Sequence, residues 1–165
     1  MFPHFLTAQD PVYSTVLTEL RAGDKRTHWM WFIFPQLEAL GRSPMPKYYG
    51  LQDLDAARAY LADPVLGPRL RECVATVLAV ADRTAHQIFH SPDDLKFRSC
   101  LTLFEAAASA DKSLQWSDLS REGHETYGRM AQRAASPTDP VFPAALTKFY
   151  AGERDPLTLE LLGQG

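Results

Sequence analysis

The chain has 165 residues, of which 45% are hydrophobic and 22% are charged. This length and composition are typical of one folded domain with a single hydrophobic core. The 17 basic and 20 acidic side chains give a formal net charge of −3, so the chain as a whole does not attract a phosphate backbone and we expect no nucleic-acid partner. No apolar run approaches the roughly 20 residues that cross a bilayer, and we expect no membrane partner.

The N-terminus and the cysteines predict a cytoplasmic protein. Residues 1–5 carry no basic region before an apolar segment and no small-residue cleavage site, so we expect no secretory signal. Cys73 and Cys100 both occupy apolar positions of predicted helices. We interpret them as buried free thiols in a reducing compartment rather than as a disulfide.

Helix starts are indicated where a capping side chain comes directly before proline, which is favoured at the first helical position. These pairs are Asp10-Pro11, Asp63-Pro64, Ser91-Pro92, Asp139-Pro140 and Asp155-Pro156. An apolar stripe follows the first pair and predicts a helix over residues 11–22. A second helix is predicted to start at Asp53 and to end at the Asp63-Pro64 turn.

The remaining segments are also predicted to be helical. The strongest periodicity runs from Leu70 to Ala81, with Pro68 in the first turn. Four further helices are predicted over residues 85–90 behind Thr84, from Pro92 to about Ala108, over 142–149 with a stop at Gly152, and over 157–162. We therefore predict a mainly α fold, a single compact multi-helix domain with little or no sheet, over residues 1–165. Residues 110–138 are the least patterned and are predicted to be an insertion or mobile excursion, with a helix around 122–134.

The run Trp29–Phe34 has four aromatic residues among six apolar ones. Its neighbours are helical, which favours a buried helical turn that ends near Pro35 over a buried strand. Packing in the core is the simplest interpretation of such a run. The alternative is a pocket, in which Trp29 and Trp31 form a stacking wall and the flanking His28 and Gln36 supply hydrogen bonds.

A second cluster begins at Gly41-Arg42-Ser43-Pro44 and continues to Tyr49. A glycine, a guanidinium and a Ser-Pro helix start together resemble an anion-binding cradle. The alternative is a turn whose arginine is solvated.

The helix after Ser91 directs a lysine toward an apolar arc. At about 100° per residue, Lys96 lies beside Cys100, Leu103 and Ala107, with Ser99 at the margin of that arc. A lysine aimed at the core requires a partner or a bound anion, unless its stem carries the ammonium out to water. The opposite side is predicted to be solvent surface, with Asp94 and Arg98 paired; its residues are Asp94, Arg98, Thr102 and Glu105.

His86 and His90 are four residues apart, with Asp93 and Asp94 nearby, as in some metal sites. An exposed helix face explains the two histidines as well. We therefore predict no metal and no cofactor.

These clusters resemble the signature of a bacterial family, domain-of-unknown-function family 1810. The resemblance rests on the stretches 25–36, 41–43, 48–49 and 94–104, and covers about residues 8–108 and 139–163, ending in a tail that contains Gly152, Asp155, Pro156 and Thr158. Residues 110–138 depart from the family pattern. The resemblance implies a small, mainly helical single domain with no established activity. Members are sometimes labelled calpastatin, but such inhibitors are disordered, whereas this chain is rich in aromatic residues of the kind that are buried.

The leading hypothesis is a cytoplasmic helical domain that binds a small anionic or nucleotide-like ligand. Trp29, Trp31 and Tyr49 would line the pocket; Arg42, with Ser43, and Lys96 would contact the anion; His28, Gln36 and Ser99 would orient it. If the protein is an enzyme, His28 or Lys96 is the expected acid or base in a hydrolase or group-transferase reaction. The alternative is a non-catalytic protein-interaction module.

Overall fold

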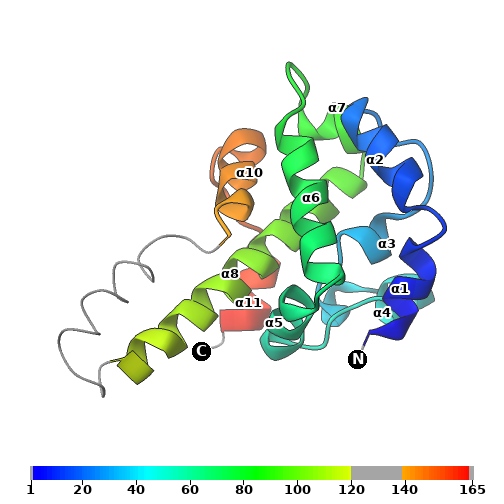
Figure 1. The fold of residues 1–165 in the computed structure, drawn as a ribbon. Coiled ribbons are helices and arrows are strands. Elements are labelled where there is room, and N and C mark those ends of the chain that lie inside the picture. Colours follow the sequence, from blue (N-terminus) through cyan, green and yellow to red (C-terminus); the bar gives the residue numbers. More distant parts are fainter. Residues whose placement is uncertain (1, 120–138, 164–165) are drawn as a thin grey trace.

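The computed structural model describes the backbone of residues 2–119 and 139–163, which forms a bundle of helices (Figure 1). The only β pairing in these two ranges is an isolated parallel bridge between Leu37 and Leu51. The prediction of a mainly α domain is confirmed. The elements in chain order are α1 (Pro3–Gln9), α2 (Tyr13–Arg21), α3 (Met30–Ile33), the 3₁₀ helix η1 (Glu38–Leu40), α4 (Pro44–Tyr48), α5 (Leu54–Ala62), α6 (Leu66–Leu78), α7 (Ala85–Phe89), α8 (Asp93–Leu119), α10 (Val141–Tyr150) and α11 (Pro156–Gly163).

The long helix α8 crosses the domain and contributes much of the core (Figure 1). It packs against α5, α7, α10 and α11, while α6 packs against α2, α5 and α10. Phe104 of α8 lies between two rings, at centroid distances of 5.5 Å from Tyr60 of α5 and 5.9 Å from Phe142 of α10. All three rings are fully buried, and large aromatic side chains of this kind dominate the energy of a core.

Several predicted helix starts are confirmed. The Asp53 carboxylate accepts a hydrogen bond of 2.9 Å from the Ala56 amide at the start of α5. Thr84 and Gln87 form a reciprocal capping box at the start of α7. Pro68 lies in the first turn of α6, as predicted. These signals are correct because each involves only residues within one turn of the helix.

Two of the predicted Asp-Pro caps are wrong, because each aspartate binds an arginine of α6 instead. Asp10 lies 2.8 Å from Arg69, and α2 begins only after Val12. Asp139 binds Arg71, and Pro140 is the residue that precedes α10. A guanidinium offers two hydrogen bonds and a full charge, and so outcompetes the backbone amides of a helix end.

Helices α1 and α8 also differ from the prediction. Helix α1 was not predicted; Phe5 anchors it in the core. Helix α8 continues to Leu119 instead of ending near Ala108, because no proline or glycine interrupts residues 109–119. The first part of the predicted excursion is therefore helical. The remainder, including the helix predicted around 122–134, lies outside the described residues.

The face of α8 that was assigned to solvent is covered by the C-terminal tail, so that prediction is wrong. Thr102 is only 1% exposed, and its hydroxyl accepts a hydrogen bond of 3.0 Å from the Asp155 amide. Arg98 lies 3.5 Å from the Asp155 carboxylate rather than pairing with Asp94. Both carboxylate oxygens of Glu105 accept hydrogen bonds from Arg154.

Cys73 and Cys100 are buried and free, as predicted. Burial raises the pKa of the Cys73 thiol to about 12, which keeps it protonated at neutral pH. Among the helices of the described ranges, none combines the length and the apolar character that a membrane span requires.

A buried carboxylate, Glu19 of α2, holds the segment that leads into α3. It accepts hydrogen bonds from the Arg26 amide (2.8 Å), from the amide and hydroxyl of Thr27 (3.1 and 2.7 Å), and from the Trp29 indole (2.9 Å). Burial alone would raise the pKa of Glu19, but these hydrogen bonds hold it below its ordinary value. The charged form of Glu19 thus stabilises the folded state.

We expect Glu19→Gln to lower the free energy of unfolding at pH 7 by about 2 kcal/mol or more, because an amide cannot accept all four hydrogen bonds. The lowered pKa means that this contribution is complete above the ordinary glutamate pKa of about 4.3 and is lost as the pH falls through the folded-state value. Urea denaturation at pH 7 and at pH 3.5 measures both. A difference between the wild type and the variant that stays constant over this range would contradict the assignment.

Candidate functional site

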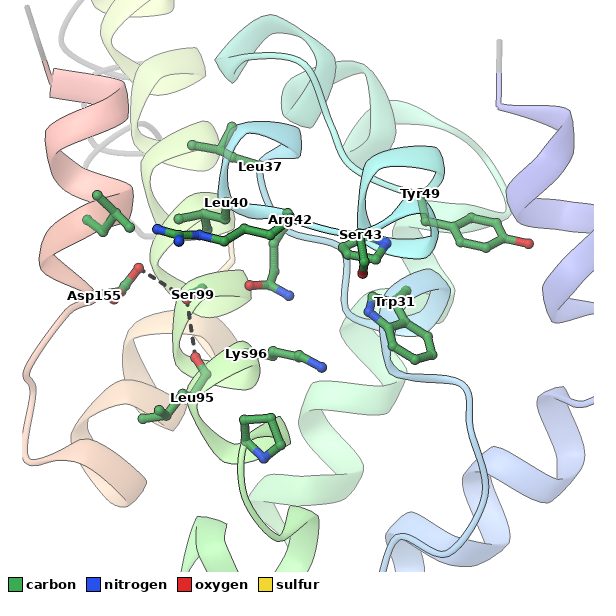
Figure 2. A pocket seen from close by; sticks show the side chains of 15 residues that line it. Trp31, Leu37, Leu40, Arg42, Ser43, Tyr49, Leu95, Lys96, Ser99 and Asp155 are labelled. Atoms are coloured by element: carbon green, nitrogen blue, oxygen red, sulfur yellow. Dashed lines mark hydrogen bonds between the residues drawn. The ribbon is translucent and has the colours of Figure 1, made fainter.

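A cavity of about 370 Å³ lies where α3, η1, α4, α8 and the start of α11 meet (Figure 2). The polar groups on its wall come from segments far apart in the sequence. Most of the site residues predicted from the sequence line it: Trp31, Gln36, Arg42, Ser43, Tyr49, Lys96 and Ser99. Its apolar wall comes from Leu37, Leu40, Pro46, Pro92, Leu95 and Leu157.

Lys96 reaches the cavity from the first turns of α8. Its side chain is 26% exposed, and its ammonium lies 3.2 Å from the Asp93 carboxylate and 4.9 Å from the centre of the Trp31 ring. Figure 2 shows the lysine extending from α8 toward Trp31. The side chain is therefore neither buried in the core nor extended freely into water. An ammonium over an indole face is favourable.

Asp93 is shared with a second lysine, Lys25, on the segment before α3. The Lys25 ammonium lies 2.9 Å from Asp93, and its side chain is only 7% exposed. It also donates to the Thr27 carbonyl (2.7 Å) and lies 4.9 Å from the centre of the Trp29 ring. One carboxylate thus serves two ammonium groups, which leaves Lys96 only partly neutralised.

Arg42, Ser43 and Gln36 bring unpaired polar groups to the opposite wall. Within the described ranges, neither the Arg42 guanidinium nor the Gln36 amide has a hydrogen-bond partner or an ion-pair partner among the side chains and backbone. Ser43 precedes α4 but makes no capping hydrogen bond. Gly41 is needed here, because a Cβ at this position would lie 2.9 Å from Pro46. These groups are available to a bound molecule.

Asp155 and Ser99 form a fixed part of the wall. The Ser99 hydroxyl donates to the Asp155 carboxylate (3.1 Å) or to the Leu95 carbonyl (3.2 Å), as the dashed lines in Figure 2 show. Asp155 also accepts hydrogen bonds from the amide (3.1 Å) and the hydroxyl of Thr158, and so caps α11. This carboxylate holds α11 against α8 and places Leu157 at the cavity.

The aromatic wall consists of Trp31 and Tyr49. Trp31 is partly exposed, and its indole N–H makes no hydrogen bond to the parts of the chain that the structure describes. Tyr49 packs on Phe32 at a centroid distance of 5.4 Å and stacks on His4 at 5.8 Å. Its hydroxyl points away from Lys96 (Figure 2), and burial raises the pKa of Tyr49 above its ordinary value. Tyr49 lines the cavity with its hydroxyl directed away from Lys96.

Two of the predicted site residues do not line the cavity. Trp29 is 1% exposed and belongs to the core, so it has no face open to a ligand. His28 is exposed and is not among the lining residues. Helix α3 begins at Met30. Trp29 therefore precedes the helix and lies in the core, whereas Trp31 lies within the helix and contacts Lys96.

The described residues contain no group of three or more His, Cys, Asp and Glu side chains that could hold a metal ion. His86 and His90 face different carboxylates, at 3.4 Å from Asp94 and 3.3 Å from Asp24 respectively. Each histidine thus contributes to a separate surface contact.

The groups that hold the site together were not predicted from the sequence in these roles. Asp93 was weighed as a metal ligand, although its spacing of three residues before Lys96 is that of a helical ion pair. Asp155 was identified as a cap, but its contact with Ser99 spans 56 residues and has no local signal. Lys25 gave no signal either, because nothing in the sequence indicates that it is buried.

We expect Asp155→Ala to loosen α11 and open one wall of the cavity, because the helix loses its cap and Ser99 and Arg98 lose a partner. Loss of such a cap costs about 1–2 kcal/mol. Hydrogen exchange should become faster at the amides of α11 while those of α6 remain protected. Equal acceleration in both helices would show that Asp155 stabilises the whole fold rather than this wall.

A family model and a solved structure are similar to this chain. A family model described as "Protein of unknown function (DUF1810)" matches residues 2–121. The crystal structure of the conserved hypothetical protein Rv1873 from Mycobacterium tuberculosis is similar, with 42% sequence identity, a TM-score of 0.79 and an alignment that covers 98% of this chain and 95% of that chain. A search among curated proteins finds no match. Since the family model covers most of the chain, including the segments that carry Arg42 and Lys96, this protein belongs to the DUF1810 family.

Proposed function

We propose that the protein binds a small anionic metabolite in the cavity between α3, α4, α8 and α11. The observation that carries this proposal is that Arg42 and Lys96, which are 54 residues apart in the sequence, line one cavity. Cationic side chains gathered in a hollow strengthen the local positive potential and attract anions. The whole chain is acidic, with a net charge of −3, so the positive character of this site is local.

The polar groups around the two cations support a ligand with directional contacts. Gln36, Ser43 and the Trp31 indole provide hydrogen-bonding groups that no described part of the protein occupies. Ligand sites combine an apolar wall with a few convergent polar groups of this kind. A volume of about 370 Å³ is at the small end of the usual range of about 300–1,000 Å³, which favours a compact metabolite.

The aromatic and leucine side chains support a ligand that also has an apolar or planar part. Trp31 presents part of its ring to the cavity, and Leu95 and Leu157 are about half exposed, at 52% and 48%. An aromatic face stacks readily on a planar group. A nucleotide-like molecule combines both features and remains our leading example.

Binding, rather than a particular reaction, is the function that these contacts support best. Lys96 is the candidate acid or base, as expected from the sequence, since it lines the cavity while His28 does not. The Ser99 hydroxyl contacts Asp155, but that carboxylate already accepts hydrogen bonds from Thr158. We therefore interpret Ser99 and Asp155 as a fixed wall, and a hydrolase or group-transferase activity stays an expectation.

The alternative, a protein-interaction module, is favoured by the exposed leucines. Leu157, Leu159 and Leu161 of α11 are each 40–48% exposed. Grouped apolar side chains of this kind can form a docking surface. The two functions differ in which residues matter, because docking would depend on α11, whereas anion binding would depend on Arg42 and Lys96.

We expect Lys96→Met and Arg42→Gln each to weaken anion binding by about tenfold or more, because each removes a charge-assisted contact. The measurement is a thermal-shift screen with nucleotides, sugar phosphates and small carboxylic acids, followed by calorimetry on the hits. Lys47→Met is the matched control, since it removes one exposed positive charge from α4, next to the cavity, without removing a lining residue.

Hits that lose affinity in Lys96→Met and keep it in Lys47→Met would support the cavity as the site. Equal losses in both variants would indicate a diffuse electrostatic effect and would contradict the proposal. A complete absence of hits would favour the interaction module, and Leu159→Ser, on α11 but outside the cavity wall, would then be the variant to test.

A further inference from the structure

The cavity and its immediate ion-pair partners carry a positive charge that the protein leaves unbalanced. Arg42 has no carboxylate partner in the described parts of the chain, and Lys25 and Lys96 share Asp93. Asp155 is balanced by Arg98, at 3.5 Å. Three cations (Arg42, Lys25 and Lys96) against one carboxylate (Asp93) leave an excess of two positive charges.

Lys25 is the reason that Asp93 neutralises Lys96 only in part. The Lys25 side chain is 7% exposed, against 26% for Lys96, and its distance to Asp93 is shorter, 2.9 Å against 3.2 Å. A buried ammonium without a counter-charge is costly. Asp93 is therefore committed to Lys25, and most of the Lys96 charge remains available to the cavity.

Resting on the function proposed above, we propose that the ligand presents a doubly charged phosphate monoester group, whose two charges Arg42 and Lys96 balance from different sides of the cavity. A phosphate monoester carries close to two negative charges at neutral pH, which equals the excess that the site leaves unbalanced. A guanidinium donates two parallel hydrogen bonds to phosphate oxygens, and an ammonium adds a compact charge. A single carboxylate would leave one positive charge uncompensated.

The polar groups beside the cations suit a phosphate with an organic substituent. Ser43 and Gln36 can donate hydrogen bonds to phosphate oxygens. Trp31, Leu95 and Leu157 provide the apolar wall for the ester group. The charged lining residues are Arg42, Lys96 and Asp155, and Tyr49 is the remaining titratable one; no histidine lines the cavity.

Calorimetry with two matched probes tests this inference: phenyl phosphate, which is doubly charged above its pKa of about 6, and methyl phenyl phosphate, which has the same ring and a single charge. At pH 7.5 we expect phenyl phosphate to bind about tenfold or more tightly than the diester. Its affinity should fall below about pH 6, as the second charge is lost, until it approaches that of the diester. The affinity of the diester should not change with pH.

A variant outside the cavity wall tests the role of the buried pair. In Lys25→Met, Asp93 is free to neutralise Lys96, so the preference for phenyl phosphate over the diester should shrink toward one. Lys25→Arg, which keeps the charge, should retain the preference. If Lys25→Met fails to fold by circular dichroism, Arg42→Gln tests the charge balance instead, because it removes one of the two excess charges, and Lys25→Arg alone reports on the pair with Asp93.

The outcomes separate this inference from the function on which it rests. Equal binding of the two phosphate probes would overturn the preference for a dianion. Benzoate, a singly charged carboxylate with the same ring, is the third probe; if it binds and neither phosphate does, the site takes another anion and the inference is wrong. An unchanged preference in a folded Lys25→Met would overturn the role of Lys25. If no anion binds at all, both the inference and the proposed function fall.

Discussion

The site depends on the ion pair between Lys25 and Asp93. The Lys25 ammonium is almost removed from water, and a buried charge of this kind persists only with a counter-charge and hydrogen bonds. Asp93, in the first turn of α8, supplies that charge, while the Thr27 carbonyl and the Trp29 ring complete the surroundings. The pair fixes the segment before α3 against the start of α8. Because Trp31 lies in α3, directly after the first of these segments, and Lys96 lies in the first turns of α8, their contact follows from this constraint.

Glu19 fixes the same segment from its other side. It binds the backbone of residues 26 and 27 and the Trp29 indole, so the buried Glu19 and the partly buried Asp93 together hold the segment that leads into α3. This explains why two tryptophans in one aromatic run differ in role. Trp29 is hydrogen-bonded to Glu19 inside the core, whereas Trp31, two residues later, is partly exposed at the cavity. The polar network thus sets which aromatic ring can reach a ligand.

The sequence allowed the helices to be predicted wherever their signals were local. The capping box at Thr84, the cap at Asp53 and the periodicity of α6 each depend on neighbouring residues, and the structure has all three. The wrong caps and the wrongly assigned face of α8 all involve distant partners. Asp10 and Asp139 bind arginines of α6, and Thr102 is covered by a tail that begins some 50 residues later. Where a side chain can bind either a local or a distant partner, the folded structure decides which one it binds. The spacing of residues in the sequence does not predict that choice.

The same distinction explains what could be predicted of the cavity. Lys96 was identified because a lysine on the apolar arc of a helix conflicts with its surroundings, and Arg42 because it follows a glycine next to a helix start. Neither argument required a partner. The pairing of Asp93 with Lys25 and of Asp155 with Ser99 could not be inferred, since it joins segments that only the folded chain brings together. The elements of the site are thus locally encoded, while their coupling is not.

The residues that carry the family resemblance divide into two groups with different physical roles. Trp29, Phe34 and Phe97 are buried, and packing in the core accounts for them. Gln36 and Arg42 bury no apolar surface of that kind and satisfy no side-chain or backbone partner in the described structure. Arg42 is exposed and Gln36 is partly exposed, so water can satisfy their donors and the fold alone does not require their placement. Both line the cavity with Lys96, and the proposal of an anion site rests on this shared position.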